Sequence, residues 1–247
     1  MKNFKNLFLA GLAVASLAFT GCLHIIEEVT FRDSGKGNYT MTLDMSEMKG
    51  MMDMLKNMSP DSTGGTEIPS QGEQDNSMAQ MGKELSGVAS TLRNLKGIMN
   101  VVEINDTSSF RFGYSFDFED VAALNRALKV VNKDKYDSDV EEVFKFTGKN
   151  FERLGAGDMG AEIKKALAEG SGDEEEGGEE AMDMMKMMFA DMSYKQVYHF
   201  PDREIKKNSN ELAEVSTDKH SMTITLKPFD EEQQQKKVTI ATAVKLK

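Results

Sequence analysis

Methionine supplies the largest group of side chains in this sequence that could bind a ligand. The chain contains 19 methionines and no tryptophan, and many of the methionines crowd two stretches, 45–58 and 182–192. Thioethers are soft donors that suit Cu(I), and they also adapt to irregular apolar surfaces such as a lipid-binding groove. At helical spacing the same residues can simply form the packed side of a helix. The candidate binding residues are Met45, Met48, Met52, Met184, Met185 and Met188.

Histidine and acidic residues show no metal-binding spacing. His24, His199 and His220 are far apart in the sequence, and no second histidine lies at ligand spacing from any of them. The acidic tract 173–180 lacks the alternating ligands and the fixed glycine turn of an ordered calcium loop. The sequence therefore predicts no metal site and no cofactor.

Motifs for nucleophilic or phosphoryl-transfer chemistry are also missing. The sequence has no Gly-x-Ser-x-Gly pattern and no phosphate-binding glycine loop. The glycines at 35 and 37 suit a hairpin turn. These observations predict a protein that is not an enzyme and has no catalytic residue.

The single cysteine, Cys22, follows a segment with the features of an export signal. Lys2 and Lys5 precede an apolar run over 7–19, which is shorter than the ~20 apolar residues that span a bilayer. This run fits the core of a secretory signal, and a small residue, Gly21, precedes the cysteine. We therefore expect residues 1–21 to be a signal peptide.

The sequence Phe19-Thr20-Gly21-Cys22 resembles the lipobox of bacterial lipoproteins, in the looser form of Bacteroidota-like bacteria. The resemblance implies lipidation of the Cys22 thiol with diacylglycerol and further acylation of its amine, with chains such as palmitate. One acyl chain alone holds a protein only marginally, so two or three are needed. It implies an anchor in the cell envelope, in the outer membrane, facing the periplasm or the cell surface. The alternative is a secreted protein whose cysteine follows the signal by chance.

The charge balance restricts the partners. The chain carries 30 basic and 41 acidic residues. Removing residues 1–21 removes two lysines and leaves 28 basic against 41 acidic residues, a formal charge of −13. Nucleic acid and anionic headgroups repel such a chain. We expect no nucleic-acid partner, and we expect the membrane contact to come from the lipid anchor.

Alternating apolar and polar residues predict strands, and two stretches share one pattern. Residues 25–43 predict a β-hairpin, followed by a helix over 45–57 that begins at the capping residue Asp44. Residues 101–116 predict a second hairpin, and Asp117 begins a helix that continues to Val131. Two hairpin–helix (ββα) units indicate an internal repeat, or a local arrangement that occurs twice.

The remaining sequence predicts one further hairpin, two insertions and a β-rich end. Residues 143–154 flank a Thr-Gly-Lys turn, and 193–246 contain four or five strand patterns with a short helix over 229–235. The stretches near 59–77 and 169–180 are rich in glycine, proline or acidic residues, and we expect both to be disordered. The segments 22–58 and 193–230 resemble LppM-type lipoprotein domains, which implies an α+β envelope domain without established catalysis.

Taken together, the sequence predicts an α+β fold in a single domain over 22–247. We expect an antiparallel sheet built from β-hairpins, with ββα units and helices mainly on one face. The predicted function is a lipid-anchored, non-enzymatic binding or scaffold module for a lipid, a glycolipid or an envelope protein. Copper handling in the periplasm through methionine and a purely structural role are the alternatives.

Overall fold

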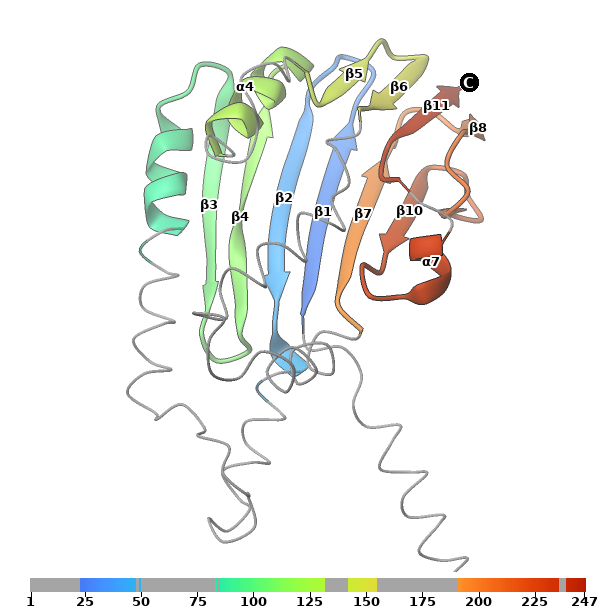
Figure 1. Ribbon diagram of the computed structural model, residues 1–247. Helices are drawn as coiled ribbons and strands as arrows, with labels where there is room; N and C mark the ends of the chain where they lie inside the picture. Colours follow the sequence, from blue (N-terminus) through green and yellow to red (C-terminus); the bar gives the residue numbers. More distant parts are fainter. Residues whose placement is uncertain are drawn as a thin grey trace, which may run out of the picture.

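The protein is built on two β-sheets of unequal size, and helices pack beside them (Figure 1). The computed structural model describes residues 23–47, 49, 83, 85–131, 142–154, 191–235 and 239–247. Within these residues the fold is mostly sheet, with few helices. The predicted mixture of helix and antiparallel sheet is confirmed at this level.

The large sheet has seven strands in the order β3-β4-β2-β1-β7-β10-β9. All neighbours are antiparallel except β1 and β7, which are parallel and pair His24 with Ser193 and Thr30 with His199. The strands are β1 (His24–Phe31), β2 (Gly37–Asp44), β3 (Ile98–Asp106), β4 (Arg111–Phe118), β7 (Ser193–His199), β9 (Ala213–Val215) and β10 (Ser221–Leu226).

The small sheet has four antiparallel strands in the order β5-β6-β11-β8 and lies near the end of the large sheet where β1 finishes (Figure 1). Phe31, at the end of β1, contacts Phe146 and Phe151 of this sheet with ring centroids 5.1 Å apart in both cases. The strands are β5 (Phe144–Phe146), β6 (Asn150–Arg153), β8 (Ile205–Asn208) and β11 (Thr242–Leu246).

Strand alternation explains where the core lies. On β1 every second residue from Glu27 to Phe31 is buried, because successive side chains of a strand point to opposite faces. The register carries this inward face across the sheet, since Val29 pairs with Tyr39 on β2 and with Tyr198 on β7. Around Phe31 the core is largely aromatic, with Phe118, Phe144, Phe146, Phe151 and Phe200 as its ring neighbours.

Helical segments accompany the sheets in the described part of the chain. A helix over 85–93 buries Ala89 and Leu92. The predicted start of the second helix at Asp117 is wrong, because Asp117 lies on β4. The helix α4 (Val121–Val131) begins after Asp120, whose carboxylate accepts the backbone N–H of Ala123 (2.7 Å) as an N-terminal cap. It packs against β3, β4 and β5. A one-turn helix, α7 (Glu231–Gln235), follows β10.

Two features of the predicted architecture are wrong. The sequence predicted one antiparallel sheet, whereas the strands divide between two sheets, because β11 pairs with β6 and β8 instead of joining the large sheet. The sheet is also not wholly antiparallel. β1 and β7 are separated by a long stretch of chain and run side by side in the same direction, and local hairpin patterns contain no signal for such a distant pairing.

The hairpins themselves are confirmed, as β1–β2, β3–β4 and β5–β6. The finer prediction of two repeated ββα units with helices mainly on one face stays a prediction. The helix expected after β2 lies mostly outside the described residues, as do the insertions expected near 59–77 and 169–180.

Candidate functional site

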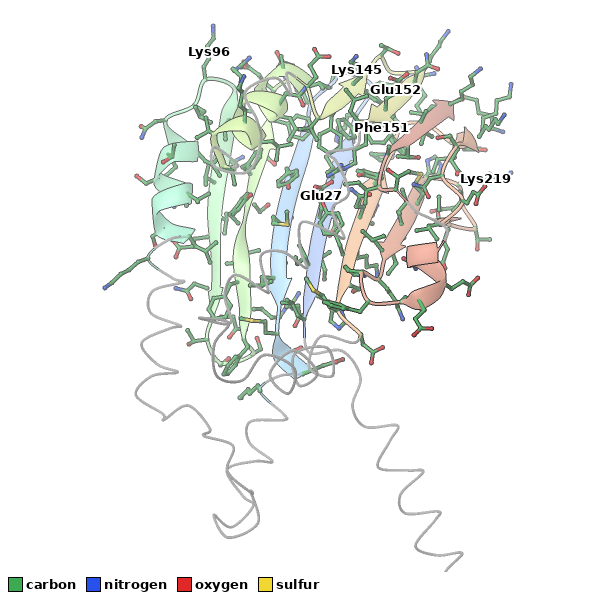
Figure 2. All side chains as sticks on the ribbon, in the orientation of Figure 1. Glu27, Lys96, Lys145, Phe151, Glu152 and Lys219 are labelled. Atoms are coloured by element: carbon green, nitrogen blue, oxygen red, sulfur yellow. The ribbon has the colours of Figure 1, made fainter. Side chains whose placement is uncertain are left out.

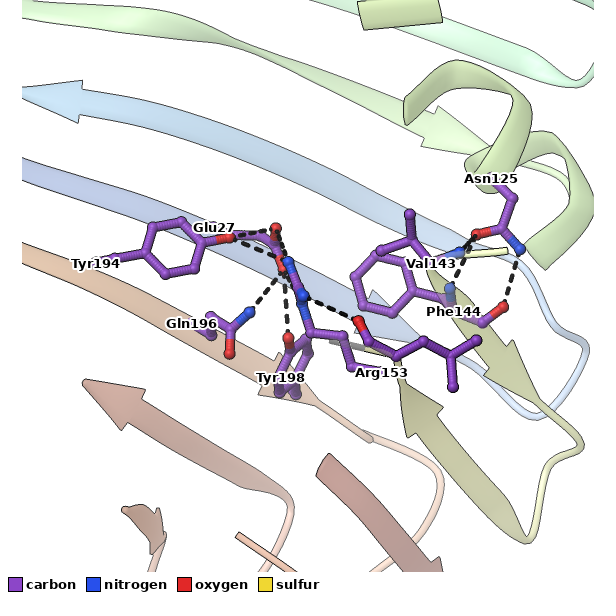
Figure 3. Close-up of polar contacts among 9 residues, drawn as sticks. Glu27, Asn125, Val143, Phe144, Arg153, Tyr194, Gln196 and Tyr198 are labelled. Atoms are coloured by element: carbon purple, nitrogen blue, oxygen red, sulfur yellow. Dashed lines mark hydrogen bonds and ion pairs between the residues drawn. The ribbon is translucent and has the colours of Figure 1, made fainter. Parts of the chain in front are cut away.

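A buried ion pair joins the two sheets. The guanidinium of Arg153, on β6, donates from Nε to Oε1 and from Nη2 to Oε2 of Glu27, on β1, and both distances are 3.2 Å. The side chains are only 1% and 4% exposed. Figure 3 shows the pair between the strands. A buried charge is costly unless it is paired and hydrogen-bonded, so each of these residues depends on the other.

Two tyrosines and a glutamine complete the cluster, which we call the Glu27–Arg153 cluster. The hydroxyl of Tyr194 donates to Glu27 Oε2 (2.7 Å), and that of Tyr198 donates to Oε1 (3.2 Å). Gln196 Nε2 lies 3.5 Å from Oε1, and the opposite orientation of this amide directs its oxygen to Arg153 instead. The carboxylate of Glu27 is therefore surrounded by donors (Figure 3).

Burial and charge fix the protonation states in the cluster. Burial raises the pKa of Tyr194 and Tyr198 well above 10, and the negative charge of Glu27 raises it further. Burial alone would lower the pKa of Arg153, but the attraction of Glu27 and the two tyrosines outweighs this effect and raises it. The tyrosines thus remain neutral donors, and the arginine remains a cation.

The strand register places these residues together. Ile25, Glu27 and Val29 of β1 pair with Tyr194, Gln196 and Tyr198 of β7, so all six side chains point to the inward face. Arg153 reaches this face from the small sheet and pairs in register with Thr242 of β11. The hydroxyl of Thr242 is buried without a hydrogen-bond partner in the described part of the chain.

Local patterns in the sequence do not identify this cluster, although they contain one signal of it. The alternation that places Val29 and Phe31 inward also places Glu27 inward, because Glu27 lies two residues before Val29 on the same strand. A charged residue on the apolar side of a strand pattern requires a partner. The partner itself, Arg153, is 126 residues away along the chain, and no local pattern identifies it.

A second buried polar contact connects α4 to the small sheet. The side-chain oxygen of Asn125 accepts the backbone N–H groups of Val143 (3.1 Å) and Phe144 (2.9 Å), and its nitrogen donates to the carbonyl of Phe144 (2.9 Å). Together with the Glu27–Arg153 cluster, this contact holds the small sheet against the rest of the protein (Figure 3). Within each of these two sets, the buried polar groups are hydrogen-bonded to one another. Both sets therefore stabilise the fold.

The other candidate region is the end of the large sheet where β1 begins. The carbonyl of Leu23 accepts the backbone N–H of Ser193 (3.1 Å). The ring of His24 is 2.8 Å from the Ser193 hydroxyl and 3.9 Å from Glu47. Met45 follows β2 and donates its N–H to the carbonyl of Phe110 (2.9 Å). We call this region, formed by Leu23, His24, Met45, Phe110 and Ser193, the β1-start end.

Most of the residues predicted from sequence to bind or be modified lie outside the described part of the chain. These are Cys22, Met48, Met52, Met184, Met185 and Met188. Met45 is described, and it is 8% exposed. A single buried methionine does not distinguish a packed core from a groove or a copper site, so the three alternatives stay open.

The three histidine side chains have separate partners, although the backbones of His199 and His220 lie close together, since Phe200 donates its N–H to the carbonyl of His220 (2.7 Å). His24 contacts Ser193, His199 contacts Glu28 (2.8 Å), and His220 Nδ1 lies 3.0 Å from the backbone carbonyl of Phe200. In the described residues, no group of three or more histidine, cysteine or acidic side chains could hold a metal ion. No helix in that part is long and apolar enough to cross a membrane.

Comparison with known proteins does not assign the chain to a family. No family model and no curated protein matches the chain. Among solved structures, the chain is similar to the folded domain of the Mycobacterium tuberculosis LppM protein, determined by NMR. The similarity has a TM-score of 0.36 and 8% sequence identity, and it covers 92% of this chain and 91% of the LppM domain.

Proposed function

We propose that this protein is a lipid-anchored lipoprotein of the bacterial cell envelope that acts as a non-enzymatic binding or scaffold module. The observation that carries the proposal is the position of β1. This strand begins at His24, two residues after Cys22. The backbone carbonyl of Leu23 accepts a hydrogen bond from Ser193 of β7. An acylated Cys22 would hold the large sheet at the membrane without an intervening linker.

The reach of the chain makes this statement quantitative. An extended chain spans at most about 3.6 Å per residue, so Cys22 and His24 are no more than about 7 Å apart. The β1-start end would therefore lie next to the lipid headgroups. The eight residues of β1 extend over about 26 Å at ~3.3 Å per residue. The opposite end would face away from that membrane.

The places where the two methionine-rich stretches join the large sheet favour a lipid as the ligand. Met45 directly follows β2 and Met192 directly precedes β7, and His24 pairs in register with both Asp44 and Ser193. Both methionine-rich stretches of the sequence thus join the sheet beside His24, two residues after Cys22. Methionine adapts to flexible apolar ligands, which supports a lipid or glycolipid at this end.

The experiment compares the wild-type full chain with Cys22→Ser in a bacterium that processes lipoproteins. We expect the wild type to incorporate an alkyne analogue of palmitate and to sediment with membranes after carbonate washing. The variant should lose both properties while keeping the same thermal unfolding temperature. Labelling and sedimentation that are unchanged in the variant would contradict the anchor.

A second arm tests the ligand. Native mass spectrometry of the full chain, extracted in nonionic detergent, should detect a bound phospholipid or glycolipid. The triple substitution of Met184, Met185 and Met188 by serine should reduce its occupancy at least about fivefold, since it removes apolar contact area. The control is Met99→Ser, on β3, because Met99 is already 48% exposed. Equal occupancy in all three proteins would reject the methionine-rich stretches as the lipid site.

A further inference from the structure

Lysines gather on the outward face of the small sheet. Lys245 of β11 and Lys207 of β8 are directly opposite each other in the antiparallel register. Both are exposed, and Lys206 lies beside them at the irregularity in the pairing of β8 with β11. Lys149 is held close by its carbonyl, which accepts the N–H of Leu246 (2.8 Å). We call Lys149, Lys206, Lys207 and Lys245 the lysine face.

The charges on this face are not neutralised by neighbours. Within the described residues, none of its four lysines forms an ion pair, whereas two lysines at its margin do: Lys145 pairs with Glu142 (3.5 Å) and Lys247 with Glu204 (3.0 Å). Glu152, also at the margin, pairs in register with Lys145. Figure 2 shows Lys145 and Glu152 on the small sheet. Four cations in one place stand out in a chain of net charge −11.

The arrangement conflicts with what stability alone would favour. Like charges directly opposite each other on neighbouring strands destabilise a sheet. A feature that breaks a local rule without a compensating contact indicates a functional constraint. An anionic partner would supply the missing compensation for Lys207 and Lys245.

Size and position determine the kind of anion. The small sheet packs on Phe31, at the far end of β1 from His24, so the lysine face is separated from the β1-start end by about 20 Å or more, at ~3.3 Å per residue of strand. That distance exceeds the ~8 Å over which charges act at physiological ionic strength, so the headgroups beside Cys22 are not its target. A long, stiff polyanion would extend over the acidic remainder of the protein and be repelled by it.

We propose that the lysine face binds a short acidic peptide segment of a partner protein in the cell envelope. Lysine is a flexible point charge without the planar fork that selects a phosphate or carboxylate bidentately, so the face suits closely spaced carboxylates on an extended segment. The four lysines lie on β8, on β11 and in the turn before β6. Three neighbouring strands about 4.8 Å apart present a width of about 10 Å, which matches about three extended residues.

The test uses a fluorescein-labelled hexaglutamate peptide and the full chain in nonionic detergent, with binding followed by fluorescence anisotropy at low salt. The test variant is the double substitution Lys207→Gln and Lys245→Gln. The matched control is Lys96→Gln with Lys129→Gln, which removes two exposed lysines elsewhere and changes the net charge equally. We expect about tenfold weaker binding in the test variant and less than twofold weaker binding in the control, since nearby charges act more strongly than distant ones.

Three results would overturn the proposal. The first is equal weakening in both variants, which would make the effect one of total charge. The second is the absence of peptide binding to the wild-type protein at about 20 mM salt, a concentration at which ions screen the charges only weakly. The third is tighter binding, through Lys207 and Lys245, to vesicles containing phosphatidylglycerol than to the peptide. Because the measurement is made in detergent, it does not depend on the acylation of Cys22.

Discussion

Two arginine–carboxylate pairs connect β1 to distant parts of the chain with the same fork geometry, and they differ in their surroundings. In the interior, Arg153 donates two hydrogen bonds to the carboxylate of Glu27, and both N–O distances are 3.2 Å. At the surface, Arg203 donates two hydrogen bonds to the carboxylate of Asp33, in the turn after β1, with N–O distances of 2.7 Å and 2.8 Å. The exposed pair is the shorter one, but its side chains are 30% and 42% exposed.

Burial, and not distance, should determine how much stability is lost when one partner of such a pair is removed. Water and salt screen the Asp33–Arg203 pair, so it contributes little to stability. The Glu27–Arg153 pair is shielded, so removing one partner leaves a charge without compensation in the interior. The buried pair therefore ties the fold together, whereas the exposed pair adjusts stability slightly and in a pH-dependent way.

The largest expected effect is that of Arg153→Met. This variant leaves Glu27 buried without its counter-charge, and we expect it to lower the free energy of unfolding by about 3–5 kcal/mol. Urea titration followed by circular dichroism measures this loss. The double variant Glu27→Leu with Arg153→Met removes both charges and should recover most of it, because apolar replacements of a buried pair are often tolerated. A double variant as unstable as the single one would contradict the account.

Arg203→Met sharpens the comparison with a smaller effect. The hydrogen bonds from Arg203 and its charge lower the pKa of Asp33 below its ordinary value. A group with a lowered pKa in the folded state stabilises the fold above its unfolded pKa, near 4, and this contribution is lost as the pH falls through the folded pKa. We expect the loss of stability at pH 7 to be much smaller than that of Arg153→Met, because water screens the exposed pair.

The pH dependence provides the check on that variant. Between pH 6 and pH 3 the urea midpoint of the wild type should fall more than that of Arg203→Met, because only the wild type loses the Asp33 contribution. If the two proteins show parallel midpoints over this range, the exposed pair contributes nothing. A loss at pH 7 as large as that of Arg153→Met would show that burial does not distinguish the two pairs.

Local patterns in the sequence were sufficient for the hairpins and for the C-terminal strands. The alternation in 25–43 and 101–116 corresponds to β1–β2 and β3–β4, because these strands pair with their neighbours in sequence. The parallel pairing of β1 with β7 and the separate small sheet were not predictable in this way. They depend on contacts between residues more than 80 positions apart, such as Val29 with Tyr198 and Phe151 with Val244.

The candidate sites divide along the same line. Cys22 and the methionine-rich stretches were visible because their signal is composition and spacing along the chain. The Glu27–Arg153 cluster and the lysine face were not visible, since each is assembled by strand register from segments that are individually ordinary. Lys207 and Lys245 become neighbours only when β8 and β11 pair.

The most direct test of the central claim uses the absence of tryptophan from the chain. Phe110→Trp places a single indole at the β1-start end, and Lys145→Trp places one on the small sheet, each in the acylated full chain on vesicles with brominated phospholipids. If Cys22 anchors the sheet without a linker, the indole at position 110 should be strongly quenched and the one at position 145 should not. Equal quenching at both positions, or none at either, would contradict the proposed attachment.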